Sequence, residues 1–139
     1  MKSILWKKRS SKNGLLYVIL DTKVTRPNNI NIFSLADRLA SSGVDIFQLR
    51  AKDFCDRDLI NTAEKLSKII HKRKKLFLIN DRADIAYFCG ADGLHLGSGD
   101  ISPNQARKIL GNKSIIGRTV HSLSELHKFS KEKIDYVSI

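Results

Sequence analysis

The chain has 139 residues, 25 of them basic and 14 acidic, which gives a formal net charge of +11. This length fits one domain with a real core but is short for a complete (β/α)₈ barrel, which needs roughly 200 residues or more. No apolar run approaches the roughly 20 residues of a membrane span, and no signal peptide is visible, so we expect a cytoplasmic protein that spans no membrane. The basic residues are scattered without interleaved aromatics, so we expect no binding of nucleic acid.

The first part of the chain differs in composition from the rest. Residues 1–13 are basic and serine-rich without a clear period, so we interpret them as an N-terminal extension outside the core. Residues 14–139 are interpreted as one partial α/β barrel domain. Its two cysteines, Cys55 and Cys89, have neither metal-site nor disulfide spacing and are expected to stay reduced.

Buried apolar runs alternate with amphipathic segments from Gly14 onwards. The predicted strands are Leu15–Leu20, Val44–Arg50, Leu76–Asn80, Gly93–Leu96, Ser114–Gly117 and Asp135–Ile139. The predicted helices are Asn31–Ser42, Asp56–Lys72, Arg82–Phe88, Ser102–Leu110 and Ser122–Lys131, and Val24–Asn29 is predicted to be a loop. Five βα units and a sixth strand predict a parallel sheet with right-handed crossovers, in either a doubly wound sheet or a barrel.

The last predicted strand has nothing after it to cover its edge. Tyr136–Ile139 is mostly apolar, and an exposed parallel edge is a liability. We therefore expect the sequence to be a truncated barrel or a decayed fragment rather than a complete domain.

Polar residues follow three of these strands at their carboxyl ends, where ligands bind in α/β folds. Gln48, Arg50 and Lys52 alternate along one strand, so their side chains emerge on one face. Together they are typical of a polyphosphate cradle, or alternatively of an ion-pair network. Asn80, at the end of the next strand, is placed to hydrogen-bond a heterocycle or a substrate amine, or only local backbone.

Two carboxylates at neighbouring strand ends are the best metal candidates. Asp81 and Asp100 can hold one Mg²⁺ and leave coordination positions for phosphate oxygens. The alternative for each is a helix N-cap.

Two histidines lie near the same strand ends. His121 follows the fifth strand and is either a general acid or base or a residue that orients the next helix. His95, flanked by apolar residues, is interpreted as a packed, hydrogen-bonded histidine rather than a catalyst.

Four segments in this order resemble the thiamine phosphate synthase/TenI family. They are Gln48-Leu49-Arg50-Ala51-Lys52, Ile79-Asn80-Asp81-Arg82, Gly90 to Gly97 with Asp100, and Ile116 to Ser122. The resemblance runs from about Leu16 to the last residue. It implies a (β/α)₈ TIM barrel, here truncated after about five βα units plus a sixth strand, and a transferase of thiamine biosynthesis.

The synthases join hydroxymethylpyrimidine pyrophosphate to thiazole phosphate, releasing pyrophosphate and forming thiamine phosphate. The resemblance implies that Gln48, Arg50 and Lys52 contact the pyrimidine pyrophosphate, with Asn80 on the pyrimidine side. It implies Asp81 and Asp100 as ligands of the cofactor Mg²⁺. Thr119 would lie near the pyrophosphate.

The TenI branch of the family offers an alternative. Its thiazole tautomerases need no metal and use a histidine, here His121, and the segment Gly117–Ser122 favours that branch. Ala51 stands where the synthases usually carry an acidic residue. A further alternative is an inactive relic, because the family's thiazole-phosphate loop lies beyond Ile139. The sequence leaves open whether the chain forms a homo-oligomer.

Overall fold

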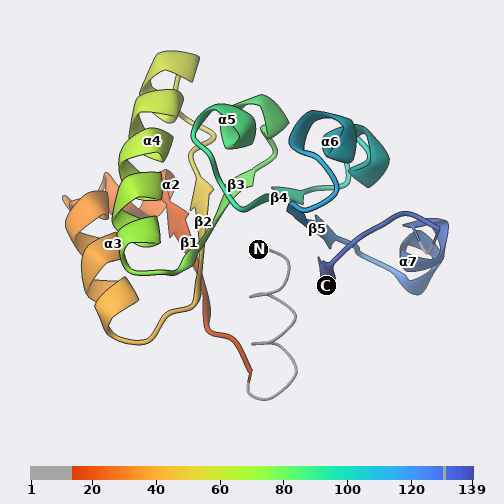
Figure 1. Cartoon of the computed structure of the whole chain (residues 1–139), viewed down its shortest axis with the longest axis horizontal. Coiled ribbons are helices and arrows are strands. Elements are labelled where there is room, and N and C mark those ends of the chain that lie inside the picture. Colours follow the sequence, from red (N-terminus) through yellow and green to blue (C-terminus); the bar gives the residue numbers. More distant parts are fainter. Residues whose placement is uncertain (1–13, 130) are drawn as a thin grey trace.

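A computed structural model describes residues 14–129 and 131–139. The expected N-terminal extension, residues 1–13, lies outside the described residues. Six strands form one parallel sheet in the order β1-β2-β3-β4-β5-β6. Each strand pairs with the next along the chain, whereas a doubly wound sheet reverses its strand order. Figure 1 shows the sheet curled like part of a barrel wall, with the helices outside it.

The elements follow the predicted alternation closely. The strands are β1 (Tyr17–Asp21), β2 (Ile46–Arg50), β3 (Leu76–Asn80), β4 (Gly93–Leu96), β5 (Ile115–Thr119) and β6 (Tyr136–Ser138). The helices are α2 (Thr22–Thr25), α3 (Ile32–Ser41), α4 (Asp56–Lys72), α5 (Ala83–Phe88), α6 (Pro103–Leu110) and α7 (Leu123–Phe129). In the described part of the chain, no helix has both the length and the apolar character that crossing a membrane requires.

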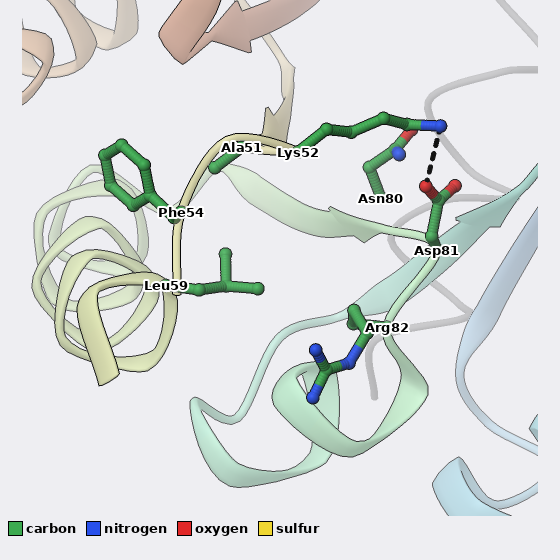
Figure 2. Close-up of a pocket in the computed structure, with 7 residues that line it drawn as sticks. All are labelled: Ala51, Lys52, Phe54, Leu59, Asn80, Asp81 and Arg82. Carbon is green, nitrogen blue, oxygen red and sulfur yellow. Dashed lines mark ion pairs between the residues drawn. The ribbon is translucent and has the colours of Figure 1, made fainter. Parts of the chain in front are cut away.

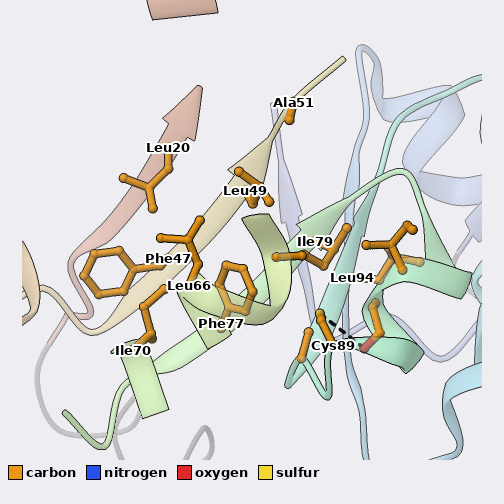
Figure 3. Close-up of a cluster of buried hydrophobic side chains, with 14 of the residues drawn as sticks. Leu20, Phe47, Leu49, Ala51, Leu66, Ile70, Phe77, Ile79, Cys89 and Leu94 are labelled. Carbon is orange, nitrogen blue, oxygen red and sulfur yellow. Dashed lines mark hydrogen bonds between the residues drawn. The ribbon is translucent and has the colours of Figure 1, made fainter. Parts of the chain in front are cut away.

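The outer face of the sheet is mainly apolar, whereas the inner face has an apolar part and a polar part. Outward residues such as Phe47, Phe77 and Leu94 pack against Leu66 and Ile70 of α4 and the other helices in the main core, shown in Figure 3. On the inner face, Ile46, Leu76, Leu78 and Ile115 form a second cluster near the amino ends of the strands. Residues later in the same strands are polar. The inner face therefore has an apolar floor beneath a polar mouth.

Local signals set most helix starts. Asn31 caps α3 by accepting hydrogen bonds from the backbone N–H groups of Phe33 and Ser34, both at 3.1 Å. Ser102 and Gln105 form a capping box at α6, and Pro103 occupies the first turn.

Three local features differ from what the sequence pattern indicates. Within the predicted loop Val24–Asn29, the first residues belong to α2, because Asp21 caps that helix by accepting from the Lys23 N–H at 2.9 Å. The cap of α4 is Cys55, without a side-chain bond, while Asp56 and Asp58 lie in the first turn, where they favour the helix dipole. Ile109, an apolar residue of α6, is 45% exposed.

Gly93 pairs with Ile115 in the β4–β5 ladder, where a side chain on the glycine has no room. A Cβ atom built on Gly93 would lie 2.0 Å from the backbone oxygen of Ile115, its neighbour across the ladder. The obstacle is a strand backbone, which cannot move aside as a flexible side chain does. A Cβ on Gly99, by contrast, meets open space.

We predict that Gly93→Ala lowers the free energy of unfolding by about 1–3 kcal/mol, because the added methyl overpacks the contact between two central strands. Urea denaturation followed by circular dichroism measures the change as a lower midpoint. Gly99→Ala is the matched control and should change the midpoint little. Equal midpoints for the two variants would contradict the prediction.

Candidate active site

The carboxyl ends of the strands surround one cavity of about 850 Å³. Its lining includes every site residue predicted from the sequence: Gln48, Arg50, Lys52, Asn80, Asp81, Asp100, Thr119 and His121. These residues come from strands β2, β3 and β5 and from the loops that follow β2 to β5. The parallel topology brings them together, because all six strands end at the same mouth.

The two cationic side chains at the carboxyl end of β2, Arg50 and Lys52, each pair with a carboxylate. Arg50 pairs with Asp21 across the β1–β2 ladder, with 2.5 Å between Nη1 and Oδ2. Lys52 Nζ lies 3.0 Å from Asp81 Oδ2. Gln48, Arg50 and Lys52 line the same cavity, and the two cations form two separate ion pairs. The polyphosphate cradle stays a prediction. Asp21 is a partner that the sequence analysis did not identify.

Asp81 occupies a strained position at the end of β3. Its φ is +65°, rare for a residue other than glycine, and the Arg82 N–H donates to the Asn80 carbonyl at 2.8 Å around it. This tight three-residue turn directs the Asp81 side chain to the cavity. Backbone strain of this kind costs about 1–3 kcal/mol and concentrates at functional sites.

The two predicted metal-binding carboxylates are neighbours. Burial, and then the adjacent Asp100 carboxylate, raises the pKa of Asp81 above its usual range, while Lys52 opposes the shift. Asp100 also accepts a hydrogen bond from the Gly97 N–H at 2.6 Å, which closes its loop.

Neither carboxylate is a helix N-cap. Arg82 caps α5 and Ser102 caps α6, so that alternative is wrong for both. Within residues 14–129 and 131–139, no cluster of three or more His, Cys, Asp and Glu side chains is arranged to hold a metal ion. Two carboxylates alone fit an ion whose remaining ligands are water and phosphate oxygens.

A smaller cavity of about 270 Å³ adjoins these groups. Figure 2 shows Lys52 reaching across to Asp81 along its edge, with Phe54 and Leu59 on the apolar side. Arg82 also lines it but is held by Asp56 and Asp84, each at 2.7 Å. Lys52, Asn80 and Asp81 therefore lie between the two cavities.

The inner wall carries a series of hydrogen bonds that begins at Asn80. Gln48 Nε2 donates to Asn80 Oδ1 at 2.6 Å, and the Tyr17 hydroxyl donates to Gln48 Oε1 at 2.6 Å. The Tyr17 and Tyr136 hydroxyls lie 2.9 Å apart, joining β1 to β6. Sequence reasoning missed both tyrosines, which read as ordinary apolar strand residues.

The series continues through His95. Its Nδ1 lies 2.9 Å from the Tyr136 hydroxyl and its Nε2 lies 2.8 Å from Thr119 Oγ1, which in turn is 3.0 Å from Ser138 Oγ. His95 is buried, and burial lowers its pKa, against a smaller opposing effect of Asp100. The interpretation of His95 as a packed, hydrogen-bonded histidine is confirmed.

Gly117 makes this arrangement sterically feasible. It stands between His95 and Tyr136 in the ladder, and a Cβ on it would lie 2.0 Å from Tyr136 Cζ. The tyrosine ring therefore crosses over the glycine to reach the histidine.

His121 lies on the exposed rim of the cavity. Its backbone N–H donates to Glu125 Oε2 at 2.8 Å, while Ser122 Oγ accepts from the Glu125 N–H at 3.1 Å. The main chain of His121 thus takes part in the start of α7. Its ring lines the cavity and has no hydrogen-bond partner among the described residues.

Arg118 supports the site from the outer side of β5. Its guanidinium is buried, donates to the carbonyls of Ile101 at 3.2 Å and Ser98 at 3.3 Å, and stacks 4.1 Å from the Phe129 ring centroid. These contacts hold the loop that carries Asp100. The sequence analysis did not single out Arg118.

Comparisons with known proteins agree with this site and fold. The family described as thiamine monophosphate synthase matches residues 16–139. The chain is 41% identical to a thiamine-phosphate synthase of Prochlorococcus marinus, over 83% of this chain and 32% of that protein. It is 34% identical to a thiamine-phosphate synthase of Clostridioides difficile, over 95% of this chain and 62% of that protein.

A solved structure gives the same result. The thiamine phosphate pyrophosphorylase from Pyrococcus furiosus superposes with a TM-score of 0.78 at 27% identity, over 89% of this chain and 58% of that one. The chain spans less than two thirds of the length of these relatives. Since the family matches nearly the whole sequence and the barrel-like sheet is shared, this chain belongs to the thiamine monophosphate synthase family.

Proposed function

We propose that the chain provides the pyrimidine pyrophosphate site of a thiamine phosphate synthase, within the (β/α)₈ barrel that the resemblance implies. One observation carries the proposal: two cations, two carboxylates and two amides converge on one cavity large enough for a heterocycle with a diphosphate. The reaction is the transfer of the hydroxymethylpyrimidine group to thiazole phosphate. The product thiamine phosphate and the pyrophosphate then leave, in the cytoplasm.

Each residue has a role that follows from its chemistry. Gln48 and Asn80 supply amide groups for the pyrimidine ring, and Arg50 and Lys52 supply positive charge for the diphosphate. Thr119 supplies a hydroxyl near the diphosphate. As the bond from the methylene carbon to the diphosphate oxygen breaks, the electron pair leaves with pyrophosphate. The thiazole nitrogen then forms the new bond to that carbon.

Asp81 and Asp100 are the residues that would hold Mg²⁺. Their oxygen donors suit this ion, and their mutual repulsion, which contributes to the raised pKa of Asp81, is relieved by a bound cation. The ion would neutralise charge that builds on the departing pyrophosphate. Lys52 pairs with Asp81, so it holds positive charge beside this carboxylate in the ligand-free chain.

A TenI-like thiazole tautomerase is the second candidate function. One observation favours it: His121 lines the cavity, and its imidazole has no hydrogen-bond partner among the described residues, so its ring nitrogens are available to a ligand. The tautomerase uses His121 and no metal, whereas the synthase uses the two carboxylates. The two functions therefore predict opposite mutational patterns.

We predict that Asp81→Asn and Asp100→Asn each abolish the Mg²⁺-dependent part of hydroxymethylpyrimidine pyrophosphate binding, a loss of about tenfold or more in affinity. Asparagine tolerates the positive φ at position 81 and can keep the Gly97 hydrogen bond at position 100. Isothermal titration calorimetry with and without Mg²⁺ measures the effect.

Asp58→Asn, on the exposed first turn of α4, is the matched control for these two variants. His121→Ala should leave the Mg²⁺ dependence intact. If binding by the unaltered chain is indifferent to Mg²⁺ and only His121→Ala changes its activity, the synthase proposal fails in favour of the tautomerase.

Lys52→Met should weaken binding of the diphosphate by about tenfold while strengthening binding of Mg²⁺ alone. The diphosphate loses a cation, and Asp81 loses the ammonium that competes with the metal. Separate calorimetric titrations with the diphosphate and with MgCl₂ test both signs. Lys68→Met on the exposed face of α4 is the control, and unchanged Mg²⁺ affinity in Lys52→Met would contradict the competition.

The raised pKa of Asp81 predicts its titration behaviour. Its carboxyl should take up a proton at a higher pH than an ordinary aspartate as the solution is acidified. In Asp100→Asn the neighbouring charge is removed, so the midpoint should fall towards the ordinary range. Carboxyl ¹³C chemical shifts, followed by NMR through the acidic range without metal, measure both midpoints; a midpoint that rises in the variant would refute the assigned cause.

A further inference from the structure

With the Gln48 amide in the orientation that the structure shows, the hydrogen bonds along the inner wall have one consistent direction. Gln48 Oε1 can only accept, so the single hydroxyl proton of Tyr17 is committed to it at 2.6 Å. Tyr17 must then accept from Tyr136, whose hydroxyl lies 2.9 Å away. Because the proton of Tyr136 is now committed as well, His95 must donate to it through Nδ1.

The direction is carried to the far end of the series. A neutral imidazole with its proton on Nδ1 has an acceptor at Nε2. Thr119 therefore donates to Nε2, and Ser138 donates to Thr119.

At the Asn80 end of the series, the direction of the hydrogen bonds decides which polar atom of Asn80 remains available to a ligand. Gln48 Nε2 donates to Asn80 Oδ1, so the Asn80 oxygen is used and its amino group has no partner among the described residues. Asn80 lines the cavity. If the Gln48 amide were turned over, every bond in the series would reverse, and Asn80 would offer an oxygen instead.

We propose that Tyr17 and Tyr136 are positioning residues that orient the Gln48 and Asn80 amides, so that the cavity presents N–H donors and selects a heterocycle with an accepting ring nitrogen. The ligand in this statement rests on the proposed function. The direction of the hydrogen bonds does not, because it follows from the ligand-free chain alone.

The protonated nitrogen of His95 reports the direction without any ligand. Long-range ¹H–¹⁵N correlation spectra of the full chain at neutral pH distinguish a protonated Nδ1 from a protonated Nε2. We expect the proton on Nδ1, although free histidine favours Nε2. A neutral His95 protonated on Nε2 would require the reversed series and would overturn the proposal.

Binding of hydroxymethylpyrimidine and of its two analogues with one ring nitrogen replaced by C–H tests the selectivity. The unaltered chain should bind the analogue that lacks the accepting nitrogen about tenfold more weakly, because a buried N–H donor is left unpaired. Tyr17→Phe releases the Gln48 amide to turn over, so this difference should shrink to about twofold or less. Tyr87→Phe, on the exposed end of α5, is the matched control and should keep the full difference.

The outcomes separate the two proposals. If Tyr17→Phe discriminates between the ligands as Tyr87→Phe does, the positioning role is overturned even if binding is strong. If the unaltered chain binds none of the pyrimidines, the proposed function and the ligand selectivity fail together, while the His95 spectrum still decides the direction. Equal weakening of all three ligands in Tyr17→Phe would indicate a merely structural tyrosine and also overturn the proposal.

Discussion

The contact between the Tyr17 and Tyr136 hydroxyls is the interaction on which the inner wall depends. It joins the two edge strands of the sheet, from residues 119 positions apart, above the apolar cluster that both rings contact. The curvature of the sheet brings these strands close enough to meet, and Gly117 leaves the space that the Tyr136 ring crosses. Tyr17 and Tyr136 therefore belong both to the apolar cluster below and to the polar mouth above. A change in sheet curvature would alter the apolar cluster and the polar mouth together.

The charged side chains at the mouth of the cavity are paired with neighbouring side chains of opposite charge. Asp81 is held in a strained turn, and burial, followed by the neighbouring Asp100 carboxylate, raises its pKa. Lys52 offsets part of this repulsion, yet the ammonium is half-exposed at the end of a flexible stem. A screened pair of this kind contributes little stability, so it can exchange partners at small cost. The site is therefore suited to a ligand that brings both anionic oxygens and a cation.

Sequence patterns predicted those features that depend on local composition. The bounds of β3, β4 and α4 agree with the prediction residue for residue, because each is a continuous buried run or a long amphipathic stripe with clear ends. The eight predicted site residues meet in one cavity because the parallel alternation fixes where strands end. Tyr17 and Tyr136 could not be found this way: their hydroxyls acquire partners only when β1 and β6 meet across the sheet. The role of Gly117 is likewise a property of its spatial neighbours, and α2 depends on a cap that looks like an ordinary strand-end aspartate.

Arg118 is a buried charged side chain whose described partners include no carboxylate. A buried guanidinium normally has a carboxylate partner, yet among the described residues Arg118 has two carbonyls and an aromatic face, and its Nε has no partner. Removing a charge from water is costly, so this arrangement has to be offset by what it fixes. What it fixes is the loop from Ser98 to Ile101, the same loop that Gly97 closes on Asp100 from the cavity side. Asp100 is thus positioned from both faces of the sheet, because Arg118, which points away from the cavity, holds the loop that carries it.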